Sequence, residues 1–182
     1  YAFENVFVYN STEGTMESYA PGGRQVREPL EAAFCKAVLD VEVGPADPLR
    51  PSFTLDHLLR TDYPLVTDPH DRVVGKRITV MRLSPEGSNG FVEIKADITG
   101  PANDIYRKID HWLSSKHLPR ESSRVLKATF RLTFQHEGPG RTPTMTFSVA
   151  VPSSCDLKSW PDEQREIGER CLKLWGVTGD DE

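Results

Sequence analysis

Residues 76–98, KRITVMRLSPEGSNGFVEIKADI, contain two apolar-rich segments separated by a short polar linker. The segments cover residues 76–83 and 91–98, and the linker SPEGSNG consists mainly of Ser, Pro, Gly and Asn. These residue types are typical of turns because they supply the backbone angles and local hydrogen bonds that reverse a chain. The stretch therefore predicts a β-hairpin.

The sequence after this hairpin carries the pattern of an amphipathic helix. Ile105, Ile109, Trp112 and Leu113 are spaced i, i+4, i+7 and i+8, which places them on one helix face. Together with the hairpin they predict a strand–strand–helix unit over residues 76–116.

The same order of elements recurs further along the chain. Residues 125–134, VLKATFRLTF, and residues 144–151, TMTFSVAV, both alternate apolar and polar side chains, which is the period-two pattern of strands. This alternation places Leu126, Phe130 and Phe147 on the apolar, core-facing sides. The segment PDEQREIGERCLKLWG follows, with acidic residues early and Gly176 as a stop signal. Its apolar stripe at helical spacing consists of Ile167, Cys171, Leu174 and Trp175, which are expected to pack on the sheet. These features predict a second unit over residues 125–176.

A fainter copy is predicted over residues 3–39, where NVFVY precedes a helix with Leu30, Phe34, Ala37 and Val38 at the same spacing. The predicted fold class is therefore α+β: an antiparallel sheet built from repeated hairpin-plus-helix (ββα) units, with helices packed on one face.

A proline-rich excursion over residues 40–75 separates the first helix from the second hairpin. Five prolines exclude a long regular element there, although FTLDHLLR can form a short helix. The roughly 40 residues before the excursion are few for an independent core, so a single domain is predicted over residues 1–182. The first residue is Tyr1 rather than Met, which leaves open that the sequence is part of a larger chain.

Composition limits the class of partner and the compartment. The chain has 182 residues and a net charge of −5, whereas a strongly basic chain would have indicated nucleic acid. Cys35, Cys155 and Cys171 are too scattered to predict disulfides or a zinc site, so we expect a cytoplasmic protein. No apolar run approaches the ~20 residues that a membrane-spanning helix needs.

Residues 91–98, FVEIKADI, also contain an acid-x-Lys pattern that many metal-dependent nucleases use. Period two places Glu93 and Lys95 on one side of the strand. In such enzymes two carboxylates hold a divalent cation, and the lysine orients or activates the attacking water. The alternative hypothesis is thus a nuclease-like phosphodiesterase that uses Asp71, Glu93 and Lys95, with Asp71 and Glu93 holding Mg²⁺ or Mn²⁺.

The preferred interpretation of the same residues is a strand with one face in solvent. The even-numbered residues from Val92 to Ile98 already provide an apolar face, so the other face needs no function to be polar. Pairing with Arg77 or Thr79 on the neighbouring strand would explain Glu93 and Lys95.

A second polar face is predicted on the strand at residues 125–134. Lys127 and Arg131 lie on the side opposite Phe130 and Phe134, and cations on a strand face can contact phosphates. Because the aromatic rings point the other way, base stacking is not indicated. Lys127 and Arg131 are therefore weak candidates for a binding surface, and nucleic acid is not the favoured partner.

Motifs for catalysis are missing from the sequence. It contains no G-x-S-x-G motif and no Gly-rich phosphate loop ahead of a helix. We therefore expect a non-catalytic binding or accessory domain, without a cofactor, that holds a protein or ligand partner through its exposed sheet face or its excursion.

Overall fold

The computed structural model describes residues 5–11, 15–21, 24–42, 52–61, 63–87, 89–136 and 138–178. The chain divides into two compact units, one within residues 1–50 and the other within residues 51–180. None of the described helices is long and apolar enough to cross a membrane.

The unit within residues 1–50 consists of a hairpin and a helix. Strand β1 (Val6–Asn10) pairs antiparallel with β2 (Thr15–Tyr19). Helix α1 (Arg24–Phe34) follows and continues into a π-helical turn, Cys35–Leu39.

The π-helical turn changes which side chains of this unit are buried. Phe34 stacks on Phe7 of the hairpin, with ring centroids 4.5 Å apart. The predicted face would continue through Ala37 and Val38, but both are exposed and Cys35 is buried instead. The prediction fails there because a π-helical turn holds more residues than an α-helical turn, so the following side chains rotate away from the predicted stripe.

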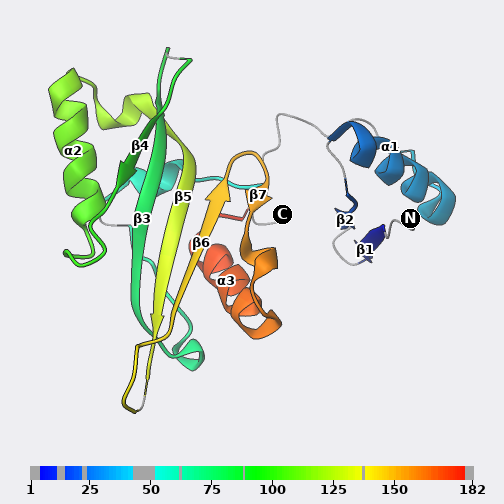
Figure 1. The fold of residues 1–182 in the computed structure, drawn as a ribbon. Coiled ribbons are helices and arrows are strands. Elements are labelled where there is room, and N and C mark those ends of the chain that lie inside the picture. The colour runs from blue at the N-terminus through cyan, green and yellow to red at the C-terminus, as the bar shows by residue number, and fades with distance from the viewer. Residues whose placement is uncertain are drawn as a thin grey trace. The chain divides into compact units, whose positions relative to one another are not determined.

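The second unit is built on a five-stranded sheet in which every neighbouring pair is antiparallel (Figure 1). Its strands are β3 (Val73–Pro85), β4 (Val92–Lys95), β5 (Ser123–Phe134), β6 (Thr144–Ala150) and β7 (Ser154–Cys155). Their order across the sheet is β4-β3-β5-β6-β7. Both predicted hairpins are present, and the mixed α+β class is confirmed.

A β-bulge on β3 sets the register of the two long central strands. Ile78 lies opposite Phe130, but Val80 lies opposite Thr129, so Thr79 is an extra residue on β3. A bulge leaves its extra residue outside the regular pairing. The hydroxyl of Thr79 compensates by donating to the carbonyl oxygen of Thr129 at 3.2 Å.

A second register shift changes the core at the beginning of β5. Arg82 lies opposite Lys127 and Leu83 lies opposite Val125, so Leu126 is the extra residue. One extra residue moves the following side chains to the other face. Val125 is consequently buried, whereas Leu126, which alternation places in the core, is only half-buried.

Two α-helices and a short 3-10 helix supply the other layer of the core. Helix α2 (Asp104–Lys116) contributes Ile105, Ile109 and Leu113 to the buried cluster. Helix α3 (Asp162–Leu174) contributes Cys171 and Leu172 to the same cluster. All five of these side chains are at most 3% exposed.

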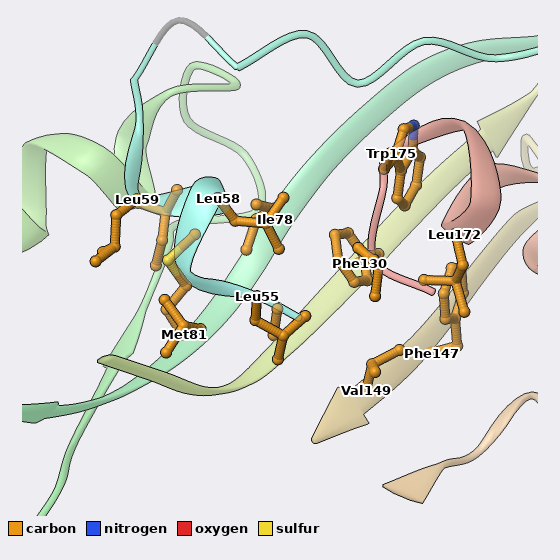
Figure 2. Packing of buried hydrophobic residues seen from close by; sticks show 14 of the residues in the cluster. Leu55, Leu58, Leu59, Ile78, Met81, Phe130, Phe147, Val149, Leu172 and Trp175 are labelled. Atoms are coloured by element: carbon orange, nitrogen blue, oxygen red, sulfur yellow. The ribbon is translucent and has the colours of Figure 1, made fainter. Parts of the chain in front are cut away.

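The aromatic end of α3 forms the centre of this core (Figure 2). Trp175 is fully buried, and its ring lies 4.8 Å from Phe130 and 6.5 Å from Phe147 between centroids. This burial was predicted from the helical spacing, and it is confirmed. Leu174 was predicted on the same stripe but is 46% exposed, because it lies on the other side of the last helical turn.

The predicted excursion turns out to contain core residues. The 3-10 helix Asp56–Leu59 lies within it and buries Leu58 and Leu59, next to buried Leu55. Figure 2 shows these leucines beside Ile78 of β3. The segment therefore belongs to the helical layer rather than to a linker, and β3 already begins at Val73.

Hydrogen bonds also tie this segment to the end of α3. His57 Nε2 and the Tyr63 hydroxyl both lie 2.8 Å from the carbonyl oxygen of Trp175. The indole N–H of Trp175 donates in turn to the carbonyl oxygen of Val66. Burial lowers the pKa of His57, which favours the neutral ring, and its Nε2–H donates to the carbonyl oxygen of Trp175.

The strand–strand–helix order is seen in β1–β2–α1 and β3–β4–α2, whereas β7 and the 3-10 helix Leu157–Ser159 lie between β6 and α3. This order alone does not establish a structural repeat, and the equivalence of the three units stays a prediction. In the sequence, Glu137-Gly138 of the second hairpin aligns with Glu86-Gly87 of the first, but Glu137 lies outside the described residues.

Candidate binding face of the sheet

The two faces of the five-stranded sheet differ in chemistry. Directly opposed residues of antiparallel strands share a face, so the register assigns each side chain. Opposite the core lies a polar surface, here called the open sheet face. Its rows are Lys95–Val80–Thr129–Ser148, Glu93–Arg82–Lys127–Ala150 and Arg77–Arg131–Thr146.

Glu93 and Lys95 both lie on the open sheet face, as alternation predicts. Glu93 Oε2 accepts a hydrogen bond from Arg82 Nη2 at 2.8 Å, and Lys95 Nζ lies 3.4 Å from Glu93 Oε1. Both contacts lower the pKa of Glu93, and the hydrogen bond from Arg82 has the larger effect. The partner is Arg82 rather than Arg77 or Thr79, because β3 and β4 pair in a register that sequence alone did not specify.

Arg82 is held from two sides. Besides its ion pair with Glu93, its guanidinium carbon lies 4.4 Å from the centroid of the Phe91 ring, which is a cation–π geometry. Arg82 and Lys95 thus supply positive charge on both sides of Glu93. The Glu93 carboxylate is thus already neutralised by two cations, which makes it a poor ligand for a metal ion.

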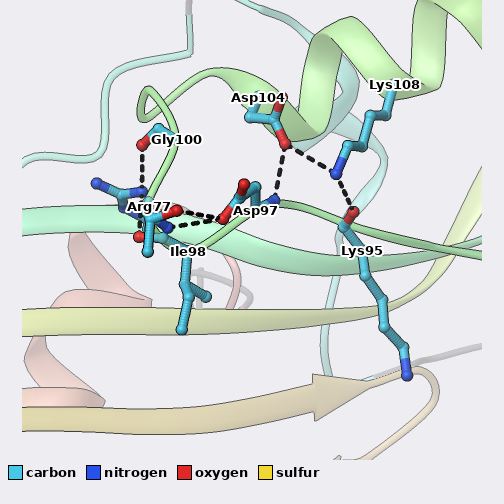
Figure 3. A network of polar contacts seen from close by, with 8 residues as sticks. Arg77, Lys95, Asp97, Ile98, Gly100, Asp104 and Lys108 are labelled. Carbon is cyan, nitrogen blue, oxygen red and sulfur yellow. Dashed lines mark hydrogen bonds and ion pairs between the residues drawn. The ribbon is translucent and has the colours of Figure 1, made fainter.

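Strand β4 ends at Lys95, and a polar network covers the chain beyond it (Figure 3). Lys108 Nζ donates to the carbonyl oxygen of Lys95 at 3.0 Å, and Asp104 accepts from the backbone N–H of Asp97 at 2.7 Å. The side chain of Lys95 points away from this network. Ile98 was predicted in the core but is 54% exposed, since the strand has already ended.

Arg77 is fixed by the same loop. Its guanidinium donates to the carbonyl oxygens of Ile98 at 3.0 Å and Gly100 at 2.8 Å (Figure 3). Carbonyl oxygens carry no net charge, so Arg77 keeps its full positive charge on the open sheet face while its position is set.

Asp71 is not part of the open sheet face. It is 8% exposed and pairs with Arg170 of α3, with Oδ1 2.8 Å from Nη2 and Oδ2 3.2 Å from Nε. Asp71 precedes the first residue of β3, whereas Glu93 lies opposite Arg82 near its other end. At the rise of a β-strand this separation is roughly 25–30 Å, so the structure does not bring Asp71 to Glu93 and Lys95.

The described residues show no metal cluster, and two of the thiols are not activated. They contain no group of three or more His, Cys, Asp or Glu side chains that could hold a metal ion. Burial raises the pKa of the Cys171 thiol to about 11 and also raises that of Cys155. Thiols with raised pKa values are mostly protonated at neutral pH and are therefore poor nucleophiles.

Lys127 and Arg131 lie on β5 near the centre of the open sheet face. Within the described part of the chain, neither side chain makes a hydrogen bond or an ion pair. Between them, the hydroxyl of Thr129 is 2.9 Å from that of Ser148. Arg124, opposite Ser84 at the start of β5, is also unpaired among the described residues.

Charge on the open sheet face is opposite in sign to the net charge of the chain. Its three rows contain the cations Arg77, Arg82, Lys95, Lys127 and Arg131 and the single carboxylate Glu93. The whole chain carries −5. Sequence reasoning identified two of these cations on β5 but missed Arg77 and Arg82 as members of the same surface, because they belong to a different hairpin.

Two hollows lie at the end of the sheet where β5 begins. Their volumes are about 440 and 340 Å³, and Glu121 and Arg124 line both. Both acidic and basic side chains line each hollow, so neither hollow concentrates one sign of charge. The open sheet face is therefore the better candidate for a functional surface.

Comparison with known proteins gives no family assignment, since no family model, curated protein or solved structure matches the chain.

Proposed function

We propose that the protein is a non-catalytic binding domain that holds its partner on the open sheet face. The observation that carries this proposal is a pair of cations, Lys127 and Arg131, that have no partner among the described residues. They lie at the centre of a surface on which Arg77 and Arg82 are fixed in place. Fixed side chains lose little further conformational freedom on binding, so their contacts yield more net affinity.

Side-chain burial supports the assignment of the face. On β5 and β6 the core positions are fully buried, whereas Lys127, Arg131 and Ser148 are half-buried and Thr146 is exposed. A sheet with one packed face and one polar face is stable without a partner, so polarity alone does not require a function. The excess of positive charge on a chain of negative net charge is the feature that favours binding.

A cytoplasmic location belongs to the same proposal. It is supported by Cys35, Cys155 and Cys171, which are all free thiols. Free thiols persist where glutathione and thioredoxin keep proteins reduced.

The proposal can be tested by recovering partners from the native source with three forms of the full chain. The test variant is Lys127→Glu/Arg131→Glu. The matched control is Arg107→Glu/Lys173→Glu, which changes the net charge equally at exposed positions of helices α2 and α3. Recovered molecules are identified by mass spectrometry, and circular dichroism checks that all three forms are folded.

A partner retained by the wild-type and control chains but lost by the Lys127→Glu/Arg131→Glu chain is the expected result. Equal retention by all three forms would place the binding surface elsewhere and would refute the proposal.

A further inference from the structure

The relief of the open sheet face restricts the kind of partner that it fits. Outward side chains of β6 are all short: Thr146, Ser148 and Ala150. The neighbouring strand β5 presents the long cations Lys127 and Arg131 beside them. Strand β6 therefore forms a low floor with a row of positive charge along one side.

We infer that this floor receives an extended acidic segment of a partner polypeptide. This inference rests on the proposed binding function and specifies the chemistry of the partner. Same-side residues of an extended chain repeat about every 6.6–6.8 Å, which matches the spacing of alternate residues on β5. Carboxylates of the segment would lie within reach of Lys127 and Arg131 while its backbone crosses Thr146 and Ser148.

Side-chain chemistry favours a polypeptide over a nucleic acid. Within β3, β4, β5 and β6 the described outward positions carry no aromatic ring, and the ring of Phe91, just before β4, lies against the guanidinium of Arg82. Single-stranded nucleic acids are held largely by base stacking on such rings. Sequence reading of duplex DNA requires a helix or a β-ribbon in a groove, and the broad face of a sheet is neither.

The hydroxyls on the floor fit the same assignment. Ser148 on β6 and Thr129 on β5 share one hydrogen bond, so one of the two hydroxyls keeps its O–H for another acceptor, although Thr129 is only 8% exposed. Thr146 is exposed and has no partner among the described residues. Hydroxyl donors at the base of the floor and cations at its side together suit carboxylate groups.

A defined probe tests the inference directly. The probe is a fluorescein-labelled 14-residue peptide of alternating Glu and Thr, titrated with the full chain at low salt and followed by fluorescence anisotropy. The comparison probes are the matching Lys–Thr peptide and a uridine oligonucleotide of equal charge to the Glu–Thr peptide. We expect saturable binding of the Glu–Thr peptide only, weakened about tenfold or more by Lys127→Glu/Arg131→Glu, since each 1.4 kcal/mol corresponds to a factor of ten.

A steric variant separates docking on the floor from general attraction to a basic surface. Thr146→Trp leaves the charge unchanged but places a large ring on β6, so the affinity for the Glu–Thr peptide should fall several-fold. The Arg107→Glu/Lys173→Glu control should bind as the wild type does. Sedimentation of each variant reports whether a second copy of the chain competes for the face.

The outcomes distinguish the inference from the proposed function. Tighter binding of the oligonucleotide, again lost in Lys127→Glu/Arg131→Glu, would contradict the acidic-peptide inference but leave the open sheet face as a binding surface. Salt-sensitive self-association that is lost in Lys127→Glu/Arg131→Glu would show that a second copy of the chain occupies the open sheet face. That result would also overturn the acidic-peptide inference. The substitutions could change neither the binding of the two probes nor the recovery of any partner from the native source. In that case both the acidic-peptide inference and the proposed binding function are refuted.

Discussion

Gly168 allows α3 to approach the sheet closely, and replacing it tests the packing of that helix. It lies inside the helix and is buried. A Cβ atom at this position would lie 2.3 Å from Leu157 Cδ2, 3.0 Å from Leu157 Cδ1 and 3.1 Å from Met145 Cε. Leu157 is 2% exposed and Met145 is fully buried, so neither side chain can move aside into solvent.

Two opposing effects determine the stability of Gly168→Ala. Alanine favours the helical conformation over glycine by about 1 kcal/mol. Overpacking of a core costs typically about 1–3 kcal/mol, and a contact of 2.3 Å is far inside the ~3.5–4.0 Å optimum for carbon atoms. Because the contact is so short, we take the upper end of the overpacking cost, about 3 kcal/mol, and subtract the helical gain of about 1 kcal/mol. Gly168→Ala should then lower the free energy of unfolding by about 2 kcal/mol.

Urea denaturation of a double-mutant cycle with Leu157→Val measures the packing contribution. Valine has no Cδ atoms, so the closest contacts disappear and the two substitutions should couple favourably by about 1–2 kcal/mol. Comparison of Glu166→Ala with Glu166→Gly, at an exposed position of α3, calibrates the helical preference. A stabilising Gly168→Ala, or strictly additive effects with Leu157→Val, would refute the close approach.

Three further predictions concern stability and metal binding. Trp175→Ala should reduce the free energy of unfolding by about 3–5 kcal/mol because the ring is fully buried, and Trp112→Ala should reduce it by less because Trp112 is only partly buried; urea melts that show equal losses would contradict this. Because burial lowers the pKa of His57 below its ordinary 6.5, the unfolded chain takes up a proton first as the pH falls below about 6.5, so the melting temperature should drop between pH 7.5 and 5.5 and should drop less in His57→Gln. Glu93→Gln and Lys95→Met should leave the melting temperature close to that of the wild type, and Mg²⁺ or Mn²⁺ should not raise it; ion-dependent stabilisation, or nucleic-acid cleavage lost in both variants, would support the nuclease hypothesis instead.

Local periodicity was sufficient to predict much of the core. Alternation identified Phe130 and Phe147 as inward-facing, and helical spacing placed Ile109 and Trp175 in the core. These residues follow from period two and period 3.6, which depend only on the conformation of each segment. The α+β class could be predicted for the same reason.

Features that depend on pairing between distant segments could not be predicted. The bulge at Leu126 exchanges Leu126 for Val125 in the core, and a bulge arises from the ladder with the partner strand rather than from local sequence. Leu55 and Leu58 lie in a proline-rich stretch without periodicity, and their burial comes from contact with the sheet. The pair of Asp71 with Arg170 joins residues 99 positions apart.

The candidate site was predictable only strand by strand. Alternation placed Glu93 and Lys95 on one polar face and Lys127 and Arg131 on another. That both belong to a single surface follows from the pairing of β3 with β5, which connects the two hairpins. The cationic character of that surface emerges only when Arg77 and Arg82 are added.

The most direct test of the open sheet face as a binding surface is ¹H–¹⁵N NMR of the full chain during titration with the Glu–Thr peptide. We expect the largest shifts at the amides of Lys127, Thr129, Arg131 and Ser148, with α2 and α3 unaffected. Shifts confined to the helices or to residues 1–50, with none on β5 and β6, would contradict the account.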